Sequence, residues 1–118
     1  MADGNSITSY LEAGLRAATL RGRVIAGNLA NIDTPGYRRG AVAFEQRLAE
    51  ALASGGADLD EIEPEVFRPL DTAVEANGND VGLDREVGEM VKNSARYKAY
   101  MRVMTKLYRQ METAMRTD

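Results

Sequence analysis

The sequence predicts a mainly α-helical fold in which long N- and C-terminal helices pair as a coiled-coil-like axial assembly unit, with a short irregular middle segment. The first observation is a C-terminal apolar stripe that alternates in steps of four and three residues, as in helices that pack lengthwise on one another. Only Ser94 interrupts it; its members are Leu83, Val87, Met90, Ser94, Tyr97, Met101, Met104, Tyr108, Met111 and Met115. A shorter N-terminal stripe consists of Leu11, Leu15, Ala18, Gly22, Ile25, Leu29 and Ile32.

The 118-residue chain divides into three parts. We assign residues 1–34 to the N-terminal helix of the axial core, 35–80 to a turn, a short helix and an acidic irregular segment, and 81–118 to the C-terminal helix. Charge follows a similar division: residues 53–89 hold two basic and eleven acidic residues, whereas 90–118 hold seven basic and two acidic ones. Two explanations stay open, because these charges either set the register of stacked subunits or are simply solvated.

The N-terminal helix is expected to begin between Ser6 and Ser9 and to end near Ile32. Ser9 and Glu12 have the spacing of a capping box, in which a hydroxyl and a carboxylate satisfy exposed backbone N–H groups. A start at Ser6 fits the apolar spacing equally well. Glycine is costly inside a helix, so Gly22 on the apolar stripe indicates close packing of another backbone.

A turn should end this helix, since Pro35 lacks a backbone N–H and disfavours helix before it. Pro35 and Gly36 suit the centre of a type II turn, which needs positive φ at its second central residue. Asn31 is expected to take the left-handed C-cap conformation, and Asp33 to bond forward to the turn backbone. The signature turn consists of Asn31, Asp33, Thr34, Pro35, Gly36 and Tyr37.

The middle segment predicts a short helix over 44–53, two short extended pieces at 65–68 and 72–75, and a tight turn at Asn77-Gly78. The last helix should run from near Gly82 to near Arg116, roughly 50 Å. The N-terminal helix is shorter, at about 25 residues or roughly 38 Å. Apolar surface is therefore left for partner subunits to cover.

Composition argues against catalysis and against bound cofactors or metals. The chain has neither Cys nor His, which removes thiolate chemistry, the commonest general base and the main nitrogen metal ligand. The acidic residues at 58–65 lack the glycine and final glutamate of an EF-hand. Methionine at helical spacing indicates packing. We expect no catalytic residue, no cofactor, no metal and no small-molecule substrate.

Other partner classes are disfavoured as well. The net charge of −3 does not suit nucleic-acid binding. No run approaches the ~20 apolar residues of a membrane span, so the chain is not expected to span a membrane. Its first residues lack the basic and apolar regions of a cleaved secretory signal.

Two motifs resemble those of flagellar basal-body rod and hook proteins. Residues 28–37 read Asn-Leu-Ala-Asn-Ile-Asp-Thr-Pro-Gly-Tyr and are similar to the family signature at the end of the N-terminal helix. Residues 77–81 resemble the stretch before the family's C-terminal helix, where further matches are Glu86, Asn93, Arg96 and Tyr97. Gly82 and Val87 depart from the family pattern, which has Asp and Met there. The short chain is most similar to the proximal rod subunits.

The resemblance implies a bacterial structural subunit of the flagellar rod in the basal body, exported without a cleaved signal peptide by the flagellar type III apparatus and assembled in the periplasm. The implied partners are other rod subunits, MS-ring proteins and rod-adaptor proteins. The terminal helices would pair and stack, helping to form the drive shaft and export channel. The expected assembly residues are Leu11, Leu15, Ile25, Leu29, Val87, Met90, Tyr97, Met101, Met104, Tyr108, Met111 and Met115.

Two alternatives assign the features differently. A cytoplasmic helical coiled-coil adaptor or regulator would use the same stripes to form a finite oligomer whose size does not change with concentration. A small carboxylate enzyme would need two carboxylates with separated pKa values beside one pocket. The sequence offers no pair that converges in this way.

Overall fold

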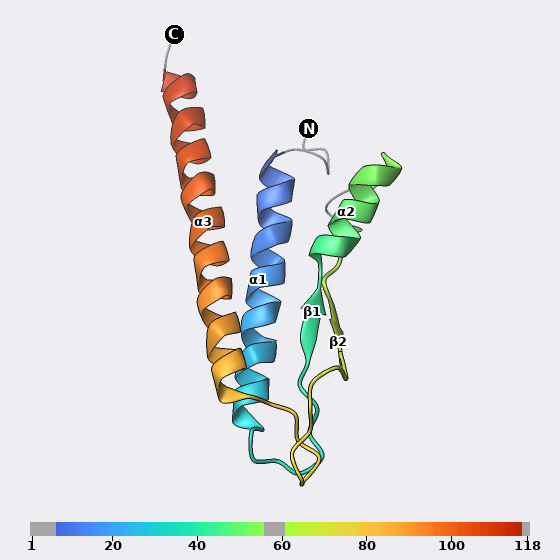
Figure 1. Ribbon diagram of the computed structural model, residues 1–118. Coiled ribbons are helices and arrows are strands. Elements are labelled where there is room, and N and C mark those ends of the chain that lie inside the picture. Colours follow the sequence, from blue (N-terminus) through green and yellow to red (C-terminus); the bar gives the residue numbers. More distant parts are fainter. Residues whose placement is uncertain (1–6, 56–60, 117–118) are drawn as a thin grey trace.

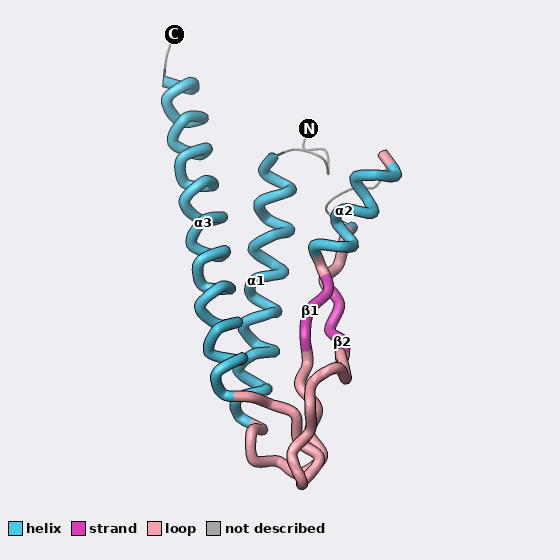
Figure 2. The backbone as a smooth tube through the Cα atoms, in the orientation of Figure 1, coloured by secondary structure: helices cyan, strands magenta, loops and turns pink. Residues whose placement is uncertain are grey.

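The computed structural model describes residues 7–55 and 61–116, and its principal-axis extents are 68 × 29 × 15 Å. Helix α1 (Ile7–Ala30) lies between helix α3 (Leu83–Arg116) and a two-stranded sheet (Figure 1). Strands β1 (Ala41–Ala43) and β2 (Glu65–Phe67) form that sheet, and helix α2 (Glu45–Ser54) follows β1. The loops gather where α1 ends and α3 begins (Figure 2). The mainly helical fold with paired terminal helices is confirmed.

Helices α1 and α3 pack antiparallel. Near the loops, Asn28 Nδ2 donates a hydrogen bond to Glu86 Oε1 at 2.9 Å. Farther along, Asn93 Nδ2 donates to the Ala18 carbonyl at 2.8 Å. The partner numbers rise on one helix as they fall on the other, which fixes the antiparallel direction.

Among the described glycines of α1, Gly14 makes the tightest contact with α3, against the ring of Tyr100. A Cβ built on Gly14 would lie 2.5 Å from Cζ of Tyr100, closer than carbon atoms approach each other. A Cβ on Gly22 would make only an ordinary contact, 3.5 Å from Asn93 Nδ2. Close packing was therefore expected at the wrong glycine, because the stripe contains Gly22 but not Gly14.

The apolar core lies on a different side of α1. The antiparallel strands pair in the register Ala41 with Phe67, Val42 with Val66 and Ala43 with Glu65. They hold β1 and α2 against α1, so that small α1 side chains pack on larger ones. The buried cluster consists of Ala13, Ala17, Val42, Phe44, Leu48 and Ile62.

The element boundaries agree with the sequence to within two residues, with a few corrections. Ser9 lies inside α1 and is not its N-cap, so the capping-box prediction was wrong, while the alternative start at Ser6 lies outside the described residues. Strand β1 was not predicted, and 72–75 contains no strand. The end of α1 also differs from expectation: Leu70 is the only non-glycine residue with positive φ in 7–55 and 61–116, so Asn31 is not left-handed.

Candidate functional site

The C-terminal apolar stripe does not face α1. The row of α3 that does so is buried or half-buried and contains Glu86, Asn93, Tyr100 and Met104. Most stripe residues stand one position after this row, at Val87, Ser94 and Met101, which turns them about 100° around the helix. Only Met104 belongs to both rows; it is 7% exposed, whereas Met101 is 41% exposed.

The N-terminal stripe divides between the interior and the surface. Leu11 and Ile25 are buried within the chain, whereas Leu15 and Leu29 are partly exposed. At about 100° per residue, Leu15 and Leu29 point to the side of the α1–α3 pair away from the strands. The exposed stripe of α3 points to the same side. We call this surface the seam face; it consists of Leu15, Leu29, Val87, Met90, Tyr97 and Met101.

The predicted assembly residues therefore fall into three groups. Leu11, Ile25 and Met104 are buried inside the chain, and the seam-face residues are exposed or partly exposed. The third group lies where α3 extends past Ile7, the first described residue of α1 (Figure 1). This last part of α3 presents exposed Tyr108, Met111 and Met115.

The signature turn has the predicted type II character. Gly36 has a φ of 76°, and the Tyr37 N–H donates to the Thr34 carbonyl at 3.2 Å, closing the turn around Pro35 and Gly36. Gly78 has a φ of 84° in the opposing turn, and a Cβ there would lie 3.3 Å from the Gly36 Cα. Two glycine turns thus pack directly on each other.

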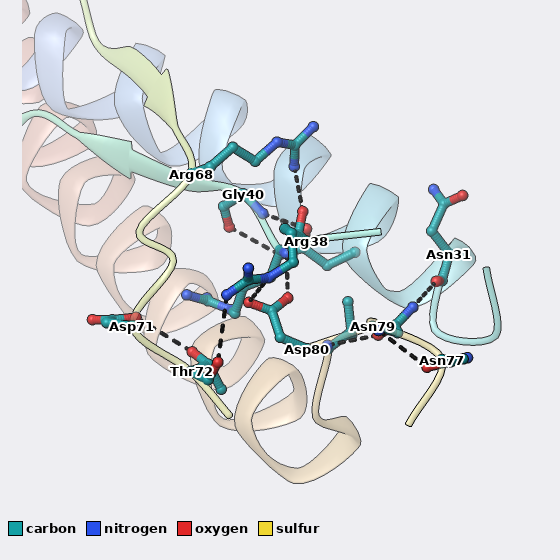
Figure 3. A network of polar contacts seen from close by, with 12 residues as sticks. Asn31, Arg38, Gly40, Arg68, Asp71, Thr72, Asn77, Asn79 and Asp80 are labelled. Atoms are coloured by element: carbon teal, nitrogen blue, oxygen red, sulfur yellow. Dashed lines mark hydrogen bonds and ion pairs between the residues drawn. The ribbon is translucent and has the colours of Figure 1, made fainter. Parts of the chain in front are cut away.

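Asn79 fastens the two turns together. Its Nδ2 donates to the Asn31 and Thr34 carbonyls, both at 2.8 Å, and its Oδ1 accepts from the Val81 N–H at 2.7 Å (Figure 3). The Gly36 N–H donates in turn to the Asn77 carbonyl at 2.9 Å. A buried amide therefore satisfies the end of α1 and the approach to α3 together.

Asp80 joins the segment before β1 to the same loop. It accepts from the Arg39 N–H at 2.6 Å and from Arg38 Nε at 3.0 Å. Burial of the carboxyl group opposes its ionisation, but the hydrogen bonds from Arg39 and Arg38 and their positive charges outweigh this, so the pKa of Asp80 is lowered. Asp80 is thus held as a carboxylate.

The centre of the junction is a buried ion pair with an amide beside it. Arg39 Nε donates to Glu86 Oε2 at 2.7 Å, and both side chains are almost completely buried. Asn28 exchanges hydrogen bonds with the Gly40 backbone at 2.8 and 3.0 Å and accepts from the Tyr37 hydroxyl at 3.3 Å. We call this network, built from α1, the pre-β1 segment and the start of α3, the polar junction.

Sequence reasoning identified the signature turn but missed the role of the polar junction. Asn28 and Glu86 were noted only as motif matches, and no structural role was assigned to Arg39. The signal available was a polar residue, Asn28, between Ile25 and Leu29 on an otherwise apolar helix face. The Asp33 carboxylate makes no hydrogen bond or ion pair with the described residues, contrary to the expected forward bond.

The described part of the chain offers mainly packing surfaces. In 7–55 and 61–116 there is no group of three or more acidic residues placed to hold a metal ion. A hollow of about 330 Å³ between α1, the strands and α3 is lined partly by Arg21, Arg85 and Arg96. None of the described helices is long and apolar enough to cross a membrane.

Comparison with known proteins supports the same interpretation. Residues 11–38 match the sequence family described as flagella basal body rod protein. The flagellar basal body rod protein FlgB of Bacillus subtilis strain 168 is 30% identical over 115 residues, which cover 89% of each protein. FlgB of Borreliella burgdorferi is 28% identical over 121 residues, covering 86% of this chain and 90% of that one. FlgB of Aeromonas hydrophila is 28% identical over 103 residues, covering 76% and 77%.

The region aligned with the Bacillus subtilis protein covers 89% of this chain, so the likeness extends well beyond the signature turn. The relatives carry the name of a structural protein of the basal body rod and not of an enzyme. The chain belongs to the FlgB family of flagellar basal body rod proteins.

Proposed function

We propose that the chain serves as a structural subunit of the proximal flagellar rod and polymerises through its terminal helices, helping to form the drive shaft and export channel. The observation that carries this proposal is the exposed apolar stripe along α3, rotated away from α1. Its exposed members include Val87, Met90, Tyr97 and Met101. A long apolar stripe left uncovered in a single chain is typical of an assembly surface.

The polar junction has a supporting role in this proposal. It fixes the direction in which α3 leaves the loops relative to α1, so the two halves of the seam face keep one geometry. Buried, fully hydrogen-bonded networks are rigid. The interface would use the seam face and the last part of α3, while Leu11, Ile25 and Met104 maintain the pair inside each subunit.

The same proposal includes the specific partner proteins and the cellular location. As a rod subunit, the chain would contact other rod subunits, MS-ring proteins and rod-adaptor proteins. It would reach the periplasm through the flagellar type III export apparatus without cleavage of a signal peptide. The names of the relatives support the basal body and the rod, and the likeness to the rod signature at 28–37 supports this route.

A substitution pair tests the interface. Met101→Asp places a charge on the seam face where water still reaches it, so the stability of the isolated subunit should change by no more than about 0.5 kcal/mol. In a packed rod the same charge would be buried, which costs several kcal/mol. We expect normal expression and export, loss of the chain from isolated basal bodies, and loss of swimming.

Two controls separate assembly from folding. Val103→Asp introduces the same charge at an exposed apolar residue two positions along α3, about 200° around the helix from Met101, and should leave swimming intact. Met104→Asp should instead unfold the subunit, because Met104 is buried within it. Normal swimming with Met101→Asp would refute the seam interface.

The adaptor alternative makes a different prediction for purified protein. A coiled-coil adaptor forms a finite oligomer whose size is independent of concentration, whereas a rod subunit stays monomeric until it polymerises with its neighbours. Sedimentation over a wide concentration range distinguishes the two. Fractionation of a tagged chain in cells with and without the flagellar export gate gives an independent answer.

A further inference from the structure

A row of basic side chains on α3 borders the seam face at Tyr97 and Met101. Lys98, Arg102 and Lys106 recur every four residues and are all exposed. Lys98 and Arg102 stand two positions before and after Tyr100, which places them about 160–200° around the helix from the α1-facing side. They form the outer flank of the molecule, and we call them the basic row.

The stretch of α3 around the basic row carries no acidic residue. Residues 91–111 of α3 contain no aspartate or glutamate. Cations four residues apart on a helix repel one another and destabilise it slightly. Lys98, Arg102 and Lys106 are therefore an unfavourable arrangement in the isolated subunit, and a surface carrying carboxylates would relieve their repulsion.

A matching set of carboxylates lies on the opposite flank. Glu61, Glu63 and Glu65 are exposed, while Ile62 between them is buried in the apolar core. All three carboxylates are exposed on this flank, on either side of the buried Ile62 and at the start of β2; we call them the acidic edge. Its only ion pair within the described residues is a long one, 3.8 Å between Glu65 and Arg47.

The two sets match in spacing as well as in sign. Alternate residues of an extended segment repeat at about 6.6 Å, and positions four apart on a helix repeat at about 6 Å. Glu63 precedes Pro64 and Glu65 begins β2, so these two carboxylates lie about 6.6 Å apart and match the spacing of two neighbouring cations of the basic row. Exposed apolar side chains accompany the acidic edge at Val66 and Phe67.

One chain cannot join the two sets itself, because α1 lies between the flanks that carry them (Figure 1). We infer that the acidic edge of one copy docks on the basic row of α3 of a second copy. Such a contact uses two different surfaces, so its repetition generates a ring or a helical array rather than a two-fold dimer. This inference rests on the proposed rod role, and it adds a lateral contact between subunits to the contact made by the seam face.

Disulfide trapping tests the contact directly, because the chain contains no native cysteine. Cells should co-express two variants, Arg102→Cys and Glu63→Cys, and their isolated basal bodies should be oxidised and separated on a non-reducing gel. We expect a disulfide-linked dimer that contains one copy of each variant. Arg102→Cys with Glu12→Cys, an exposed glutamate of α1 far from the acidic edge, is the matched control and should give none.

A charge exchange provides the second measurement. Arg102→Glu with Lys106→Glu should lower the amount of the chain recovered in basal bodies by about tenfold, because like charges would then meet. Adding Glu63→Lys and Glu65→Lys to the same chain exchanges both surfaces and should restore recovery. Loss without restoration would mean that the basic row binds a different protein, and no loss would mean that it binds nothing; either result overturns the inference.

The outcomes also separate this inference from the rod role. Absence of the unmodified chain from basal bodies would refute the proposed function itself. Presence of the chain there, with no dimer beyond the Glu12→Cys control, would refute only the contact between the basic row and the acidic edge.

Discussion

Glu86 gives the sharpest test of the polar junction. Its side chain is fully buried, accepts from Arg39 Nε at 2.7 Å and from Asn28 Nδ2 at 2.9 Å, and so connects α3 to both other parts of the junction. Glu86→Ala would remove both acceptors and leave the buried Arg39 guanidinium without its ion-pair partner. Glu86→Gln would keep an acceptor for Asn28 and remove only the charge.

The expected loss is large compared with the stability of a domain of this size. Removing one partner of a buried ion pair typically costs about 3–5 kcal/mol, and an unsatisfied buried donor such as Asn28 Nδ2 adds about 1–3 kcal/mol. Small domains have only about 5–15 kcal/mol in total. We therefore expect Glu86→Ala to leave the isolated subunit largely unfolded. Glu86→Gln should lower the free energy of unfolding less.

Urea unfolding of the purified subunit, followed by circular dichroism, measures the effect. Glu89→Ala is the matched control, because Glu89 is on the same helix and has only a 3.7 Å pair with the exposed Lys92; such pairs contribute at most about 1 kcal/mol. A loss below about 1 kcal/mol for Glu86→Ala would show that the ion pair does not stabilise the fold, and the account of the polar junction would be wrong.

The remaining predictions concern the turn, the carboxylate at its base and the helix crossing. Gly36→Val should lower the free energy of unfolding by about one to a few kcal/mol, because Gly36 has a positive φ. Thr34→Val should have a mild effect. A larger loss for Thr34→Val than for Gly36→Val in urea unfolding would indicate a chemical role for the Thr34 hydroxyl. Asp80 has a lowered pKa in the folded chain, so its contribution is complete above the ordinary carboxyl pKa of about 3.9 and is lost as the pH falls through the folded value. The stability gap between the natural chain and Asp80→Asn should accordingly shrink in acid, and a gap that widened there would contradict this. Gly14→Ala should push α3 away from α1 by its clash with the Tyr100 ring and lower the melting temperature, and Tyr100→Ala should remove most of the added penalty, which a double-mutant cycle would detect.

Periodicity predicted the helices of this fold well, because a helix needs only its own apolar spacing to be recognised. Periodicity did not predict which apolar row faces which neighbour. The stripe through Val87 and Met101 is more apolar than the row through Glu86 and Asn93, yet the second row packs on α1. Glu86 is buried there because Arg39 and Asn28 satisfy it, and neither partner lies close to it in sequence.

Strand β1 was not predicted for a related reason. Residues 41–43 are three small or medium apolar residues, Ala-Val-Ala, and too few to show an alternating pattern. Their pairing with 65–67 is a long-range contact, and Arg68 reinforces it by donating to the Arg38 carbonyl at 2.7 Å. The turn at Gly36, by contrast, was predictable because Pro-Gly restricts its own backbone regardless of what surrounds it.

On α3 the polar row is buried and the apolar stripe is exposed, and this arrangement supports an assembly function. A helix selected only for the stability of one chain would turn its apolar stripe inward and leave Glu86 and Asn93 in water, since buried ion pairs contribute little net stability compared with apolar packing. Here the polar row is buried and the apolar row is exposed. This arrangement is favourable when the stripe is covered by another molecule. The buried polar row then specifies one pairing of α1 with α3, because neither helix can rotate to bury the stripe without leaving Arg39 unpaired.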